Sequence, residues 1–176
     1  MGIYLHLTVS LAFTYVIFSI DEYFVHRTLM HKMRVAKFFK SKWLGSLCYN
    51  HMSLHHKRGY RHDTHEEDDN IFHVTLAAAI PVVFIGIPMC FVDPLTAYVI
   101  FAFGCVYAAT WWVIHHEMHR DQGRFFTTTF LFRHLERKHQ LHHIYPGTNF
   151  SLILPLSDWL FGTLASKEQI KKAGLN

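Results

Sequence analysis

The chain has 176 residues, of which 51% are hydrophobic and 16% aromatic, and carries a formal net charge of +4 at pH 7. This length predicts a single domain over residues 1–176 and excludes a catalytic domain fused to its own reductase. The three cysteines are odd in number and lack Cys-x-x-Cys spacing, which excludes a disulfide framework and a thiolate metal site.

Long apolar blocks, rather than a periodic pattern, carry the hydrophobic residues and predict helices that cross a bilayer. The first block covers residues 3–20, close to the roughly 17 to 25 residues that a spanning helix needs. Residues 74–92 and 95–114 predict two more spans, which form a tight hairpin because only two residues separate them. Residues 149–164 are apolar but short, which favours a helix lying at the interface, although simple core packing explains the same pattern.

The basic residues lie on one side of these predicted spans. All 17 Lys and Arg residues fall within 27–61 or 120–172. Because cytoplasmic segments are enriched in Lys and Arg, the N-terminus is expected outside and residues 27–73 and 115–176 on the cytoplasmic side. Only His6 among the histidines is then expected on the far side.

Histidine is unusually frequent, with sixteen residues, as many as phenylalanine. Four clusters, HRTLMH, HMSLHH, HHEMH and HQLHH, lie where apolar segments meet the predicted cytoplasmic side, and they contain eleven histidines, of which ten are candidate ligands. A single interfacial histidine is more often an amphipathic side chain than a ligand, but this repeated pattern favours metal binding. The candidate metal ligands are His26, His31, His51, His55, His56, His115, His119, His139, His142 and His143.

The spacing within the clusters suits a shared metal region. His115 and His119 lie one turn apart on a helix, and HQLHH repeats this spacing. His26 and His31 are five residues apart, so a bend or local distortion is needed if both bind metal. Imidazole suits iron, zinc, copper and nickel, and ten ligands predict two ions with about five each. The expected fold is an all-α integral-membrane helical bundle with a cytoplasmic-side, histidine-rich dimetal cap.

Asn149 and Asp158 are candidate partners for the free ring nitrogens of ligand histidines, because such bonds fix tautomer and orientation. Local helix capping explains these two residues equally well. Trp111 and Trp112 directly precede His115, and they either wall a lipid tunnel or belong to an interfacial aromatic belt.

The clusters resemble the histidine boxes of the fatty acid hydroxylase superfamily, which includes sterol desaturases, fatty acyl hydroxylases and carotenoid ring hydroxylases. DEYFVHRTLMH at residues 21–31 resembles the first box, and the other three clusters follow in the family's order. NFSLILPLSDWLFGTL at residues 149–164 is similar to the closing run of the family. The resemblance covers most of the chain.

The second cluster departs from the family pattern, because three residues separate His51 from His55 where two are commoner. Of the adjacent pair in HHEMH, His115 is preferred because His119 lies one helical turn further on. The histidines that compete with the assigned ligands are His62, His65 and His116.

The resemblance implies a non-haem di-iron oxygenase that hydroxylates or desaturates a lipid, such as a fatty acyl chain or a sterol. It implies two iron ions, for which zinc would substitute in a purified sample, dioxygen as co-substrate, and electrons from a ferredoxin or a small haem cytochrome. No catalytic residue is expected beyond the metal ligands, and the expected partners are the lipid and the membrane, with no nucleic acid. The alternatives are a carotenoid beta-ring hydroxylase and, from another class, a zinc-binding membrane protein without oxygenase activity.

Overall fold

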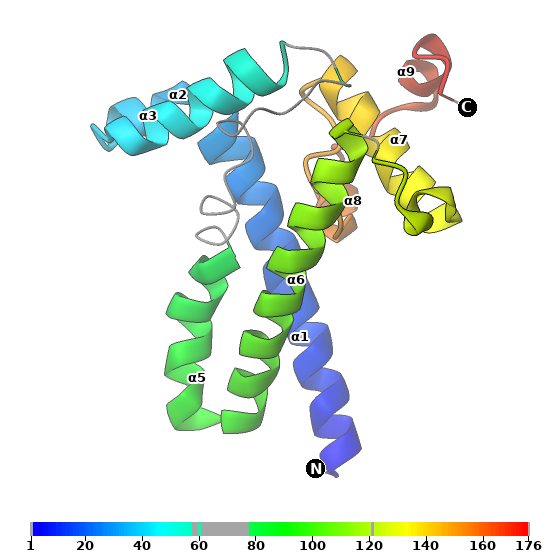
Figure 1. The fold of residues 1–176 in the computed structure, drawn as a ribbon. Coiled ribbons are helices and arrows are strands. Elements are labelled where there is room, and N and C mark those ends of the chain that lie inside the picture. The colour runs from blue at the N-terminus through cyan, green and yellow to red at the C-terminus, as the bar shows by residue number, and fades with distance from the viewer. Residues whose placement is uncertain (1, 58–59, 61–77, 121, 176) are drawn as a thin grey trace.

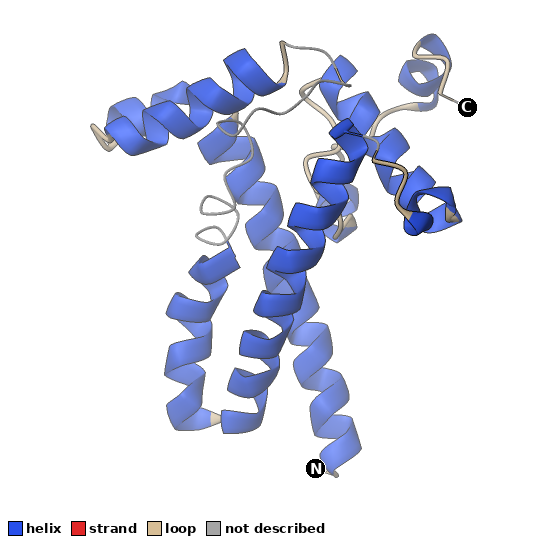
Figure 2. Ribbon diagram, in the orientation of Figure 1, coloured by secondary structure: helices blue, strands red, loops and turns tan. Residues whose placement is uncertain are grey.

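The computed structural model describes residues 2–57, 60, 78–120 and 122–175. In these residues the regular secondary structure is helical, and no strand is present (Figure 2). Helix α6 lies beside both α1 and α5, and the shorter helices are grouped near the ends of α1 and α6 (Figure 1). Two helices are long and apolar enough to cross a membrane, which agrees with the expected helical class.

The first apolar block forms one continuous helix over Ile3–Met30. It consists of α1 (Ile3–Phe24) and a π-helical turn, η1 (Val25–Met30). The expected span of residues 3–20 lies within this helix, which continues to the first histidine cluster. Its outer side chains are apolar and exposed, for example Leu5 at 57% and Val9 at 50%. Exposed apolar side chains along a whole helix suit a lipid environment better than water.

The second and third apolar blocks form a helical hairpin. The apolar helix Ala78–Val92 contains a π-helical turn, η3 (Val82–Gly86), and ends as α5 (Ile87–Val92). α6 (Pro94–Arg120) begins after Asp93, whose carboxylate accepts hydrogen bonds from the Thr96 N–H and hydroxyl. The expected span at 95–114 therefore lies inside a longer helix. Residues 74–77 of the other expected span are outside the described residues.

α1 and α6 pack closely because small and aromatic residues alternate at their contact. Phe18 and Ile100 are fully buried there, and the ring of Phe18 lies 5.4 Å from that of Tyr107. A Cβ atom on Gly104 would lie 3.2 Å from Cζ of Phe18, so glycine permits the close approach. This contact holds the two candidate spans together below the histidine clusters.

Short helices form a cap near the ends of α1 and α6 that carry histidines (Figure 1). The N-termini of three of them are capped by side chains, because Ser41 accepts from the Leu44 N–H, Thr129 from the Phe132 N–H and Ser166 from the Gln169 N–H. The helices are α2 (Met33–Phe38), α3 (Lys42–Tyr49), η2 (Asn50–His55), η4 (Phe125–Thr128), α7 (Phe130–Ile144), α8 (Leu156–Leu160) and α9 (Lys167–Lys172).

The segment 149–164 differs from the expected interfacial helix, because only α8 within it is α-helical. The residues before α8 are extended or bent, and their N–H groups donate to buried carboxylates instead of to a helical ladder. Glu22 accepts from the N–H groups of Leu152 and Leu154, and Asp158 accepts from that of Phe150. The apolar residues before α8 are mostly buried in an irregular segment, whereas Trp159, Leu160 and Phe161 are exposed.

Candidate metal centre

Two π-helical turns bring histidines that are five residues apart onto one face. η1 contains His26 and is followed by His31, while η2 contains His51 and is followed by His56. A π-helix repeats at i to i+5, so each pair faces the same way. The local distortion expected for His26 and His31 is therefore present. His51 and His56 are brought together by a π-helical turn of the same kind.

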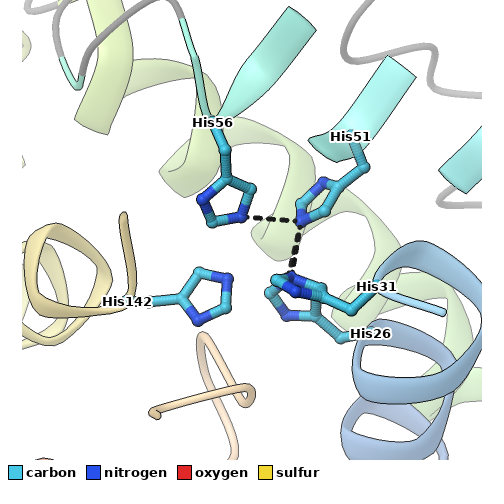
Figure 3. A group of neighbouring side chains, drawn as sticks. All are labelled: His26, His31, His51, His56 and His142. Carbon is cyan, nitrogen blue, oxygen red and sulfur yellow. Dashed lines mark hydrogen bonds between the residues drawn. The ribbon is translucent and has the colours of Figure 1, made fainter. Parts of the chain in front are cut away.

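The first histidine group consists of five residues whose ligand atoms all lie within 4.8 Å of one another. In Figure 3 the five rings approach a common centre from the end of α1, from η2 and from α7. Nε2 of His51 lies 2.9 Å from that of His26 and 3.1 Å from that of His31. The members of this group are His26, His31, His51, His56 and His142.

The second histidine group lies beside the first and draws on η2, α6 and α7. Its members are His55, His115, His119 and His139, whose ligand atoms also lie within 4.8 Å of one another. All four are buried. Adjacent residues at the end of η2 therefore belong to different groups, because His55, its last residue, is in the second group and the following His56 is in the first.

His143 lies between the two groups. Its Nε2 atom is 3.1 Å from Nε2 of His55 and 3.2 Å from Nε2 of His139, both in the second group. Its ring also stacks on that of His56 in the first group, with centroids 4.5 Å apart. With His143 beside the second group, the ten expected ligands divide into five and five.

Backbone carbonyls fix the orientation of three rings. Nδ1 of His26 donates to the carbonyl of Phe150, and Nδ1 of His142 donates to that of Thr148 at 2.7 Å. His119 does the same to the carbonyl of Tyr60 at 2.6 Å. Since a carbonyl only accepts, Nδ1 carries the proton, and Nε2 of the neutral ring keeps its lone pair. That lone pair is available to a metal ion.

Burial keeps the clustered imidazoles neutral. Burial first, and the neighbouring His26 and His56 second, lower the pKa of His31 to about 2. Burial likewise lowers the pKa of His56 to about 3. The pKa of His142 lies well below the usual value for the same reasons, burial first and neighbouring imidazoles second. Neutral imidazole is the form that binds metal.

The imidazole nitrogens of the two groups fit metal ions better than they fit a polar core in which each nitrogen has its own hydrogen-bond partner. Nε2 of His142 is buried and has no hydrogen-bond partner in the part of the chain that the structure describes. Such an orphaned atom is costly unless a ligand satisfies it. Because several lone pairs converge with too few protons to share among them, a cation is the partner that satisfies both groups. Imidazole donors suit iron, zinc, copper and nickel.

The expected contact of Asn149 and Asp158 with ring nitrogens is replaced by contacts with the backbone. The Asp158 carboxylate accepts from the N–H groups of Phe150 and Ser151 at 2.9 and 2.7 Å. The Asn149 side chain donates to the carbonyl of Lys138 and accepts from the N–H of Ala165. Asp158 thus holds the segment whose Phe150 carbonyl orients His26, so it acts on the ring through the backbone.

Glu22 supports the first histidine group, but the histidine pattern in the sequence did not predict it. Its buried carboxylate accepts from the N–H groups of Leu152, Ile153 and Leu154 and from the indole N–H of Trp111. A carboxylate directly after an apolar block, inside the first histidine box, was the available signal. The carbonyl partners of the rings gave no signal, because every residue has a carbonyl.

The competing histidines separate into two cases. His116 is outside both groups. Its ring lies tilted against that of Trp112 with centroids 4.5 Å apart, and its Nδ1 atom is 3.2 Å from the Trp112 carbonyl. The ring of His115 instead lies 4.8 Å from that of His119. The geometry therefore favours His115 over His116. His62 and His65 lie outside the described residues.

Comparison with known proteins agrees with this geometry. The sequence pattern of the family described as fatty acid hydroxylase matches residues 11–163, which include all ten candidate ligand histidines. No curated protein and no solved structure matches the chain. The match covers most of the chain and all four histidine clusters, and the protein therefore belongs to the fatty acid hydroxylase family.

Proposed function

We propose that the protein is a membrane-bound, non-haem di-iron oxygenase that hydroxylates or desaturates a lipid, such as a fatty acyl chain or a sterol. The observation that carries this proposal is the pair of adjoining histidine groups at the ends of two apolar helices. Family membership supports an oxidoreductase acting on lipids. In this proposal His26, His31, His51, His56 and His142 hold one iron ion, and His55, His115, His119, His139 and His143 hold the other.

The metal pair would supply the chemistry that side chains cannot. When bound, a pair of iron ions would supply the oxidation of an aliphatic C–H bond, in which dioxygen, two protons and two electrons from a ferredoxin or small haem cytochrome give one hydroxyl group and one water molecule. The residues of the chain have the tasks of holding, orienting and shielding this pair. The carbonyl bonds to Nδ1 of His26, His119 and His142 keep the Nε2 atoms turned inward.

Buried carboxylates support these orienting bonds. Glu22 and Asp158 together bind the N–H groups of five consecutive residues, 150–154, and so fix the Phe150 carbonyl in front of His26. Trp111 covers one side of the second group, since its ring lies 4.4 Å from that of His115. Such packing excludes water from the metal region and protects the oxidising species.

We further propose that the histidine groups face the cytoplasm, where an electron donor is available. Nε2 of His6 lies 2.7 Å from Oδ2 of Asp93. This contact joins the start of α1 to the hairpin turn, at the end remote from the two histidine groups. The Lys and Arg residues belong to segments at the histidine end. The positive-inside rule therefore supports this orientation.

The test combines metal analysis with product analysis. Purified protein is reduced without oxygen, supplied with ferredoxin and isotopically labelled dioxygen, and offered acyl lipids, sterols and carotene in parallel. We expect about two iron ions per chain, as the two groups require, and labelled oxygen in one lipid class. Labelled carotene would identify the carotenoid ring hydroxylase instead. One zinc ion per chain with no oxygenated product would contradict the proposal.

A further inference from the structure

Residues 32–49 form an arm of two short helices that extends from the histidine end of α1. α2 and α3 pack against each other and against η1, and Figure 1 shows both running sideways, across the direction of α1. The arm connects η1 to η2, which both carry histidines of the first group. The charged residues of this segment are all basic, so we call it the basic arm: Lys32, Arg34, Lys37, Lys40 and Lys42.

The positive charges of the basic arm are not paired within the protein. No acidic residue occurs in the sequence between Glu22 and Asp63. Among the described residues, no ion pair involves any of the five basic side chains. Helix stability does not explain them, because Arg34 lies in the first turn of α2 and Lys42 begins α3, where the helix dipole disfavours a cation. The basic arm therefore has the charge of a surface that binds an anionic partner outside the chain.

Two aromatic side chains lie at the tip of the basic arm, where the chain turns from α2 to α3. Phe38 is 79% and Phe39 64% exposed, and their ring centroids lie 5.1 Å apart. The exposed Lys37 precedes the two rings in the sequence, and the exposed Lys40 and Lys42 follow them. Large apolar rings that are this exposed mark an interaction site.

The two features together favour a membrane surface over an acidic protein. An acidic protein satisfies the lysines, but it has to supply an apolar pocket for two adjacent rings as well. A bilayer with anionic lipids offers phosphate groups at its surface and an apolar boundary directly beneath them. The position of the basic arm agrees, because it leaves α1 at the end where a spanning helix reaches the surface of the bilayer.

Resting on the proposed membrane-spanning arrangement of α1 and α6, we propose that the basic arm docks on an anionic leaflet. Phe38 and Phe39 insert below the phosphate groups, while Lys37, Lys40 and Lys42 bind the phosphates of acidic phospholipids. The proposed orientation brings the basic arm to the cytoplasmic leaflet, whose surface carries negative charge. Docking fixes the segment that joins η1 to η2 at the membrane surface.

The experiment measures the depth of the tip in the full-length, metal-loaded protein in lipid nanodiscs. Cys48, Cys90 and Cys105 are changed to serine, and Phe39→Cys or Glu168→Cys then carries an environment-sensitive fluorophore. The nanodiscs contain phosphatidylcholine alone or with added phosphatidylglycerol, and a lipid with a spin label near the top of its acyl chain acts as quencher. We expect strong quenching at Phe39→Cys with phosphatidylglycerol and weaker quenching without it. Glu168→Cys is the water-facing control, because the Glu168 side chain on α9 is 76% exposed.

Lysine substitutions test the contact with the headgroups. Near an anionic surface, each lysine replaced should lower the ratio of docked to undocked arms about fivefold. Lys37→Gln combined with Lys40→Gln should therefore remove most of the effect of phosphatidylglycerol on the quenching at Phe39→Cys. The matched control is Lys167→Gln combined with Lys171→Gln on α9, which removes the same charge and should leave the effect unchanged.

A second pair of variants tests insertion of the tip without changing charge. Phe38→Ser should reduce the quenching at Phe39→Cys in both kinds of nanodisc, because a hydroxyl side chain gains little from the apolar boundary. Phe38→Trp should keep the quenching, since tryptophan also favours the membrane interface. Equal quenching in these two variants would contradict insertion of the ring.

Three results would overturn the inference. Equal quenching at Phe39→Cys with and without phosphatidylglycerol would exclude recognition of anionic headgroups, and quenching no stronger than at Glu168→Cys would exclude docking. If Lys37→Gln with Lys40→Gln leaves the quenching unchanged but weakens binding of ferredoxin, the basic arm binds the acidic donor instead.

The measurement needs no turnover, so it separates this inference from the oxygenase proposal. A quenched tip in a protein that forms no oxygenated product would refute only the oxygenase. Oxygenated product from a protein whose tip is not quenched would refute only the docking. Protein that does not enter nanodiscs at all would refute the membrane-spanning arrangement on which the inference rests.

Discussion

Single hydrogen bonds decide which nitrogen of each ring faces the metal region. His142 shows this most clearly, because its Nδ1 atom donates to the Thr148 carbonyl and its Nε2 atom is buried without a partner among the described residues. His116, only one residue from a ligand position, turns toward Trp112 and contributes nothing to either group. Residue identity alone therefore does not make a ligand.

His142 and His116 form a matched pair for testing the proposed ligand set. We expect His142→Ala to lose the ion of the first group and to weaken binding of the second, so that iron falls from about two ions per chain to one or fewer. His116→Ala should keep both ions, since its ring lies outside the two groups. Elemental analysis of both purified variants checks this expectation, and equal iron contents would contradict it.

Asp158 tests the support of the rings through the backbone. Asp158→Asn puts an amide N–H where the carboxylate accepts from Phe150, Ser151 and Thr163. Loss of buried acceptors should lower the free energy of unfolding by about 2 to 4 kcal/mol. The control is Glu168→Gln, because the Glu168 side chain is 76% exposed. Denaturant titration in detergent measures both, and similar stabilities would argue against the role of Asp158.

At the scale of helices, the register of the π-helical turns divides the histidines into two groups. η2 directs His51 and His56 to one group and His55 to the other. The histidine clusters predicted which residues gather, but the division depends on a helix distortion that the second cluster did not reveal. The apolar blocks similarly predicted α1 and α6. Of the helix predicted at 149–164, only Leu156–Leu160 is helical, because Glu22, some 130 residues away, accepts from the N–H groups of 152–154.

The close packing of α1 against α6 gives a prediction at this scale. Gly104→Leu should lower the free energy of unfolding by about 1 to 3 kcal/mol, because its side chain must displace Phe18 and Val82. Ala102→Leu on the exposed side of α6 is the control and should change little. Unfolding in a denaturing detergent compares the two. A stable Gly104→Leu protein would mean that the helices have room to separate.

At the scale of the whole molecule, the histidine groups and the hairpin turn lie at opposite ends of the apolar helices. Both histidine groups lie at one end of the apolar helices, whereas the contact of His6 with Asp93 closes the other. The sequence predicted that the histidine groups lie at one end, because the basic residues and the histidine clusters lie outside the apolar blocks and next to the same ends of them. It could not supply the contacts of Glu22 with residues 152–154, which join segments far apart in the chain.

The proposed orientation is testable with cysteines placed at the two termini. Cys48, Cys90 and Cys105 are first changed to serine, and Gly2→Cys or Leu175→Cys is then introduced. We expect a membrane-impermeant maleimide to label Gly2→Cys on intact cells, whereas Leu175→Cys should react only after permeabilisation. The opposite pattern would mean that the histidine groups face outward.

Under the proposed ligand assignment, the split between His55 and His56 would couple the two ions mechanically. A single peptide unit would join a ligand of each group, so any shift of η2 would displace both together. Once one ion had immobilised this shared unit, the second ion would no longer have to do so, and its affinity would rise. Ferrous iron added to metal-free protein should therefore give a sigmoidal isotherm, with few half-loaded chains at any point.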